Sequence, residues 1–260
     1  ACADALLIFD MIDQSSVAAL LDDQRRDFFT EKGHALLSLN RPREALSLYL
    51  KAGSSKTYFP FYLSLHMGVA YEKLGRLHDA ILFYSRALEK ANAKADPDQY
   101  ESAATGLVRA FYLSGAFDKA TEFVSFLPRE IRDKPFFIHA TASCLQYQVE
   151  DDESALPAIR ELLARHPDCP GLRLNLAARL AMNGEIAAAM KAIEEERERS
   201  SSLALAFVRG VCQRISGQWA DALRILTERD EVMTFPPVPL EFFIAAYATG
   251  NGEAIEKGQR

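Results

Sequence analysis

The sequence predicts an all-α solenoid of about six helical hairpins, and two regularities along the 260-residue chain carry this prediction. Sliding the clearest copy of a recurring pattern, 67–88, along the chain places a small residue of each second helix at Ala45, Ala80, Ala120, Ala155, Ala189 and Ala222. Five residues earlier, where each first helix should end, stand Asn40, Gly75, Gly115, Glu150, Gly184 and Gly217. Glycine and asparagine tolerate the left-handed backbone that ends many helices. The spacing therefore predicts a helix, a tight turn and a second helix in each copy.

The residue types in the copy at 67–88 have a physical reason at each position. Gly68 and Ala80 are small enough to let two helix backbones approach closely. Tyr71 and Tyr84 are large enough to fill the space between neighbouring helices. Gly75 ends the first helix in a conformation that is costly for a residue with a side chain. Two amphipathic helices that pack on each other and on the next copy are the expected result.

We divide the chain, in order, into an N-terminal capping helical segment at 1–25, six repeats and an incomplete C-terminal repeat at 236–260. The repeats are expected near 26–60, 61–100, 101–135, 136–169, 170–202 and 203–235. Apolar runs at 5–9 and 17–21 predict one broken helix that covers the first repeat. Because solenoids normally close with a polar-faced terminal helix, an unfinished repeat at 236–260 favours a fragment of a longer protein.

This pattern resembles the tetratricopeptide repeat family, whose period is 34 residues. The resemblance covers about 27–229 and is strongest in the second repeat. It weakens from the fourth repeat onward, where Gln146 and Gln213 stand at positions that favour Tyr, Leu or Phe. The resemblance implies a right-handed superhelical solenoid in which the first helices line a concave channel. A channel of that kind binds an extended peptide or a helix of a partner protein.

The geometry of the family implies a set of partner-binding residues on the concave face. They are His34, Tyr62, Leu65, Arg109, Tyr112, Phe137, Tyr147, Phe207 and Arg214. Aromatic rings can anchor apolar side chains of a partner, and a guanidinium can hold a carboxylate or a carbonyl. The alternative is that several aromatic residues, above all Tyr62, Phe137 and Phe207, only pack between repeats.

Some members of the family clamp the terminal carboxylate of a chaperone tail with Lys, Asn and Arg side chains. The matching positions in this chain are Thr30, His34, His66, Ser102 and Gly106. None of these residues carries a fixed positive charge, so we do not expect capture of a chaperone tail. A histidine near an apolar face is more often a packing residue than a ligand, so His34 and His66 are not expected to hold a metal ion.

Composition excludes several other classes of partner and location. Thirty Lys and Arg against 36 Asp and Glu give a net charge of −6, which argues against a protein that binds duplex nucleic acid. No apolar run approaches the roughly 20 residues of a transmembrane helix. Four cysteines without a CxxC pair indicate buried thiols in a reducing compartment, so we expect a cytoplasmic protein. Lipid attachment at Cys2, as in a bacterial envelope adaptor, is the alternative.

The sequence carries no pattern that indicates an enzyme or a cofactor site. The segment 53–57 ends in Lys-Thr like a phosphate-binding loop but lacks the two spaced glycines of that motif. His166 and Cys169 share one turn without a third metal ligand. The leading hypothesis is therefore a non-enzymatic scaffold or adaptor that binds a protein or peptide. A regulatory or targeting module of a longer enzyme, and a homo-oligomer formed through the terminal repeats, are the alternatives.

Overall fold

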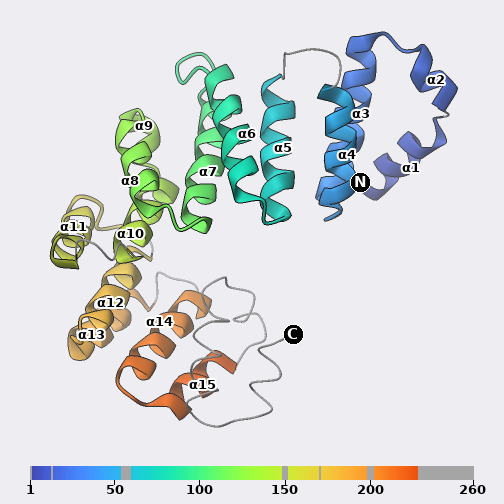
Figure 1. Cartoon of the computed structure of the whole chain (residues 1–260). Helices are drawn as coiled ribbons and strands as arrows, with labels where there is room; N and C mark the ends of the chain where they lie inside the picture. The colour runs from blue at the N-terminus through green and yellow to red at the C-terminus, as the bar shows by residue number, and fades with distance from the viewer. Residues whose placement is uncertain are drawn as a thin grey trace. The chain divides into compact units, whose positions relative to one another are not determined.

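The computed structural model describes residues 2–12, 14–53, 60–147, 152–169, 171–197 and 202–227, and all regular structure in these ranges is α-helical. Figure 1 follows the helices along the chain. They form two compact units, which divide between Ile131 and Arg132. The all-α fold predicted from the sequence is confirmed. The predicted incomplete repeat at 236–260 lies outside the described residues. A homo-oligomer formed through the terminal repeats stays a prediction.

The N-terminal unit consists of helices that pack mainly on their neighbours in the chain. They are α1 (Cys2–Met11), α2 (Gln14–Ala19), α3 (Asp22–Ser38), α4 (Pro42–Gly53), α5 (Phe61–Lys73), α6 (Leu77–Lys90), α7 (Pro97–Leu113) and α8 (Phe117–Phe126), with α9 (Arg129–Arg132) at the division. α3 packs on α4, α5 on α6, and α7 on both α6 and α8. Helix α1 packs on α3, where Lys32 pairs with Asp10 at 2.7 Å. The first helices α3, α5 and α7 also contact one another in that order.

The C-terminal unit repeats the same arrangement. Its helices are α10 (Pro135–Tyr147), α11 (Asp152–Arg165), α12 (Leu172–Met182), α13 (Ile186–Glu196), α14 (Ser202–Ile215) and α15 (Trp219–Thr227). α10 pairs with α11, α12 with α13 and α14 with α15, while α12 also contacts both α10 and α14. At the corner before α12, the fully buried Glu196 accepts a hydrogen bond from the backbone N–H of Gly171 at 2.5 Å. Each helical hairpin thus buries its apolar face against the next.

The turns inside the hairpins use the left-handed conformation that the sequence predicts. Asn40, Gly75, Gly115, Gly184 and Gly217 have φ angles between 57° and 82°. In each turn the following amide donates to the carbonyl five residues back, as from Arg76 N to Tyr71 O at 2.9 Å. The sixth predicted position, Glu150, lies outside the described residues. The five described turns confirm the prediction.

The repeated alanines lie where two helices meet. Ala45, Ala80, Ala120, Ala155, Ala189 and Ala222 are at most 1% exposed. Ala45 and Ala80 belong to a continuous apolar cluster of the N-terminal unit, in which Tyr49 and Tyr84 are fully buried. Ala189 and Ala222 belong to one of the C-terminal unit, in which Ile193 is almost fully buried. A seam of this kind, rather than one central core, is typical of a solenoid.

One ring of the N-terminal unit is held between two glycines. The ring of Tyr84, on α6, lies against Gly68 of α5 on one side and Gly106 of α7 on the other. A Cβ atom added at Gly68 would lie 2.7 Å from this ring, and one added at Gly106 would lie 2.4 Å from it. Real Cβ atoms essentially never come this close to another heavy atom. The close approach of α5, α6 and α7 therefore requires glycine at both positions.

We predict that Gly106→Ala destabilises the protein by about 2 kcal/mol, because the added methyl group overpacks the buried Tyr84 ring. The sign is informative, since the same change within an ordinary helix stabilises by about 0.5–1 kcal/mol. Urea unfolding followed by circular dichroism measures the effect. In a Tyr84→Ala background, where the ring is gone, Gly106→Ala should become stabilising. Destabilisation of equal size in both backgrounds would contradict the explanation.

Candidate functional site

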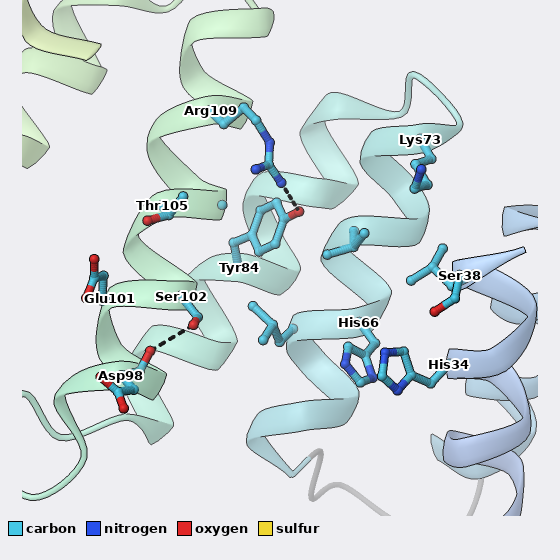
Figure 2. A pocket seen from close by; sticks show the side chains of 14 residues that line it. His34, Ser38, His66, Lys73, Tyr84, Asp98, Glu101, Ser102, Thr105 and Arg109 are labelled. Atoms are coloured by element: carbon cyan, nitrogen blue, oxygen red, sulfur yellow. Dashed lines mark hydrogen bonds between the residues drawn. The ribbon is translucent and has the colours of Figure 1, made fainter. Parts of the chain in front are cut away.

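An open groove lies along the first helices of the N-terminal unit. It has a volume of about 730 Å³ and is lined by residues of α3, α5, α6 and α7. The lining residues are His34, Leu37, Ser38, Leu65, His66, Val69, Lys73, Tyr84, Asp98, Glu101, Ser102, Thr105, Gly106 and Arg109. Figure 2 shows the labelled residues on the three adjacent first helices, with Tyr84 of α6 between α5 and α7. Successive repeats thus build a single surface.

A smaller side pocket of about 360 Å³ adjoins the groove. Its lining residues are Arg26, Asp27, Thr30, Glu31, His34, Pro60, Tyr62, Leu63 and His66, so it shares both histidines with the groove. Tyr62 is 55% exposed. Its hydroxyl accepts a hydrogen bond from Gln99 Nε2 at 3.3 Å, which links the N-terminal ends of α5 and α7. The Tyr62 hydroxyl is therefore bonded, while more than half of the side chain is accessible.

A bonded network of Glu72, Tyr84 and Arg109 fixes one end of the groove. Arg109 Nε donates to Glu72 Oε1 at 2.6 Å, and Arg109 Nη2 donates to Glu72 Oε2 at 2.9 Å. The Tyr84 hydroxyl donates to Glu72 Oε2 at 2.7 Å. It accepts from Arg109 Nη2 at 3.3 Å, and Figure 2 marks this second bond. Burial, then the charge of Glu72, raises the pKa of the Tyr84 hydroxyl. A bidentate pair of this kind joins α5 to α7 with defined geometry.

Two imidazoles form the boundary between the groove and the side pocket. The rings of His34 and His66 are stacked, with centroids 4.5 Å apart and planes inclined by 24°. His66 Nδ1 is buried and has no hydrogen-bond partner among the described residues. Burial, with a smaller contribution from His34, lowers the pKa of His66 to about 4. The stack is therefore most stable when His66 is uncharged.

Fixed charges are distributed unevenly along the groove. The carboxylates of Asp98 and Glu101 lie in the first turns of α7, whereas Lys73 is the last residue of α5. Lys73 Nζ donates to Asn40 Oδ1 at 3.3 Å. Arg109 also lies near the C-terminal ends of the helices, but Glu72 balances its charge. One end of the groove is therefore acidic, and Lys73 stands at the other.

The structure brings together four of the nine residues that the sequence analysis proposed as partner-binding. His34, Leu65 and Arg109 line the groove, while Tyr62 and His34 line the side pocket. The sequence predicts that Arg109 holds a carboxylate of a partner. In the structure its guanidinium already holds the carboxylate of Glu72. The sequence analysis did not include Glu72, because the pair is 37 residues apart and no local pattern connects the two helices.

The other five proposed residues do not join this group. Tyr112 lines neither hollow. Its ring packs edge-on with that of Phe117, with the two ring centroids 5.5 Å apart. Phe137 and Phe207 are 0% and 6% exposed, so they pack inside the C-terminal unit. Arg214 is half-buried on α14, and Tyr147 ends α10 with a side chain outside the described residues. For Phe137 and Phe207, packing within the unit is the role that their burial supports.

The described ranges contain neither a membrane-spanning helix nor a metal centre. No helix there is both long enough and apolar enough to cross a bilayer. The same residues contain no group of three or more His, Cys, Asp or Glu side chains arranged to hold a metal ion.

We predict that Glu72→Gln lowers the stability of the protein by about 1–2 kcal/mol, because it removes the charge that pairs with Arg109 in a partly buried network. The matched control is Glu44→Gln, which breaks the exposed Arg41–Glu44 pair, and exposed pairs contribute little. Thermal unfolding followed by circular dichroism compares the two variants. Equal losses in both would show that the network is not structural.

We also predict that stability falls by about 1 kcal/mol between pH 7.5 and pH 5.5 through His66 alone. The unfolded chain protonates this imidazole near pH 6.5, whereas the folded chain resists protonation until about pH 4. The contribution is therefore fully present above pH 6.5 and is lost as the pH falls toward 4. Urea unfolding at both pH values measures it, and His66→Phe should reduce the difference. An unchanged difference in His66→Phe would disprove the assignment.

Comparison with known proteins agrees with this architecture. The sequence profile of the tetratricopeptide repeat family matches residues 30–100 and 142–204, together more than half of the chain. No curated protein matches the chain in sequence.

Several solved structures share the fold at low sequence identity. A tetratricopeptide repeat protein from Parabacteroides merdae ATCC 43184 is 16% identical, with a TM-score of 0.63 over 99% of this chain and 97% of that one. The C-terminal part of a TPR repeat-containing protein from Cytophaga hutchinsonii is 15% identical, with a TM-score of 0.56 over 100% and 95% of the two chains. MamA of AMB-1 is 19% identical, with a TM-score of 0.50 over 68% and 92%. With its hairpins, its glycine turns and this profile match, the chain belongs to the tetratricopeptide repeat family.

Proposed function

We propose that the protein is a non-enzymatic interaction module that holds a segment of a partner protein in the groove of its N-terminal unit. The observation that carries the proposal is the open hollow of about 730 Å³ along α3, α5 and α7. Repeat proteins bind partners on surfaces that successive repeats build together. Scaffolding of other proteins is also the typical role of the tetratricopeptide repeat family. An extended segment that crosses α3, α5 and α7 would contact all three helices.

The groove combines residues suited to different parts of a polypeptide. Leu65 and Val69 offer apolar surface at its floor, and Tyr62 in the side pocket offers an exposed aromatic face. Ser102 and Thr105 add hydroxyl groups along α7. A mixture of apolar anchors and polar rim is typical of interfaces between proteins. The proposal therefore favours a peptide over a small metabolite.

The charges of the groove favour one orientation of the proposed partner segment. A lysine or arginine of the segment would lie near Asp98 and Glu101, and a carboxylate or carbonyl would lie near Lys73. Arg109 acts in this proposal through its bond to Glu72, by holding α5 and α7 in place, and it is not the group that binds the partner. Complementary charges of this kind contribute mainly to specificity and association rate.

We predict that Ser102→Arg blocks peptide binding. Ser102 is exposed at the groove, and its hydroxyl donates to the carbonyl of Asp98 in its own helix. A library of random displayed dodecapeptides is selected against the full chain at pH 7.5, and the affinities of the enriched peptides are measured by fluorescence anisotropy. A bulky guanidinium in the groove should weaken binding by about 30-fold or more.

The matched control is Ser125→Arg on α8. Ser125 is also an exposed helical serine, and its hydroxyl donates to the carbonyl of Glu122, but it lines neither hollow. Binding by this variant should stay within about twofold of the original affinity. If both variants bind alike, the peptide site lies elsewhere. If no peptide is enriched at all, the proposed function fails for short segments.

A further inference from the structure

The boundary between the groove and the side pocket consists of titratable groups. His34 of α3 and His66 of α5 line both hollows, and their stacked rings are the only residues that the two linings share. Figure 2 shows the rings face to face, with His34 toward α3 and His66 toward α5. A segment that enters both hollows must therefore pass along this stack. His34 is the exposed member, and His66 is the more buried one.

The surroundings of the stack favour uncharged rings. The ring of His66 lies near two tyrosine rings, with centroid distances of 6.0 Å to Tyr49 and 6.5 Å to Tyr62. Its buried Nδ1 has no hydrogen-bond partner within the described ranges. A charged ring there gains no compensating hydrogen bond and loses contact with water. The charge that acts most on His66 is that of His34 itself.

Other titratable groups line the two hollows or contact the stack. The lining groups are Arg26, Asp27 and Glu31 on α3, Tyr62 and Lys73 on α5, Tyr84 on α6, and Asp98, Glu101 and Arg109 on α7. The buried Tyr49 of α4 lies outside both linings and contacts the ring of His66. Arg26 is paired with Asp23 and Asp27, and Arg109 is paired with Glu72. Glu31 lies three residues before His34, on the same side of α3. A charged His34 would be attracted away from His66 and toward this carboxylate.

Protonation therefore works against the stacked arrangement. The buried His66 stays uncharged until about pH 4, so a charge enters the stack on the exposed His34, 4.5 Å from a ring that offers it no carboxylate. A charged His34 can leave the stack, since its side chain is exposed and the carboxylate of Glu31 lines the same side pocket. That movement would displace the shared wall of the groove and the side pocket at the same time.

We propose that the His34–His66 stack is a proton-operated switch of the partner site: the uncharged stack shapes the two hollows for a partner segment, and protonation separates the rings and releases the segment. This inference rests on the proposed function, because it concerns regulation of the same groove. The switch is reciprocal. A segment that binds the stacked form must make protonation of the stack harder, since binding and protonation favour different arrangements.

The first test follows the full chain without any partner. Histidine side chains labelled with 15N and 13C are monitored by NMR between pH 8 and pH 3.5, in the original chain and in His34→Phe. Phenylalanine can stack on His66 but cannot carry a charge. We expect the titration of His66 to move to higher pH in His34→Phe, because the repulsive neighbour is gone. Identical titration curves for His66 in both proteins would show that the rings are not coupled and would overturn the switch.

The second test measures peptide affinity at pH 7.5 and pH 5.5, with a peptide selected at pH 7.5. The original chain should bind about tenfold more weakly at pH 5.5, whereas His34→Phe should change by less than about twofold. His78→Phe is the matched control, because His78 is exposed on α6 and lines neither hollow, and it should keep the original pH dependence. The same tenfold loss in His34→Phe would overturn the proposal.

The two tests separate failure of the switch from failure of the proposed function. If no peptide binds, the partner site is wrong, and the NMR titration still decides whether the rings are coupled. If a peptide binds with the same affinity at both pH values while the rings titrate as a coupled pair, the groove does not respond to the stack. That result would overturn the switch and leave the proposed function intact.

Discussion

The contact on which the N-terminal unit depends is the Tyr84 ring held between Gly68 and Gly106. It brings a second helix, α6, against two first helices, α5 and α7, at distances that no residue larger than glycine allows. The hydroxyl of the same residue bonds to Glu72 and Arg109, so one side chain serves both packing and polar linkage. Removing either glycine would separate the helices, and removing the ring would leave a cavity between them.

The same contact makes the groove a consequence of packing. Tyr84 and Gly106 both belong to its lining, and Arg109 reaches Glu72 across the gap between α5 and α7. The spacing of these helices sets the width of the groove, so stability and the shape of the site depend on the same atoms. A mutation at this contact would change partner affinity without touching the partner. Mutations at exposed positions such as Ser102 are therefore the cleaner way to examine binding.

Sequence reasoning recovered what local chemistry determines. A left-handed turn needs glycine or asparagine, and a close helix contact needs alanine, so Gly75 and Ala80 indicate their own roles. It did not recover contacts between neighbouring repeats, such as the Arg109–Glu72 pair and the contact of the Tyr84 ring with Gly106. Nor could periodicity separate an aromatic residue that faces a channel from one that packs beneath it. Phe137 shows that ambiguity: the sequence predicts that it faces the channel, but it is buried. A channel-facing residue and a packing residue both fall on the apolar face of a first helix.

The groove combines one rigid boundary with one that a proton can alter. Tyr84 is buried, its partners Glu72 and Arg109 are partly buried, and the three side chains are bonded to one another, so that end has a defined geometry. The histidine stack is held by ring contact alone, and its buried nitrogen gains nothing from the described residues when it becomes charged. Specificity for a segment needs the rigid end, because a defined shape excludes wrong partners. Release needs the other end, because a boundary held by weak contacts can change without unfolding the helices that carry it.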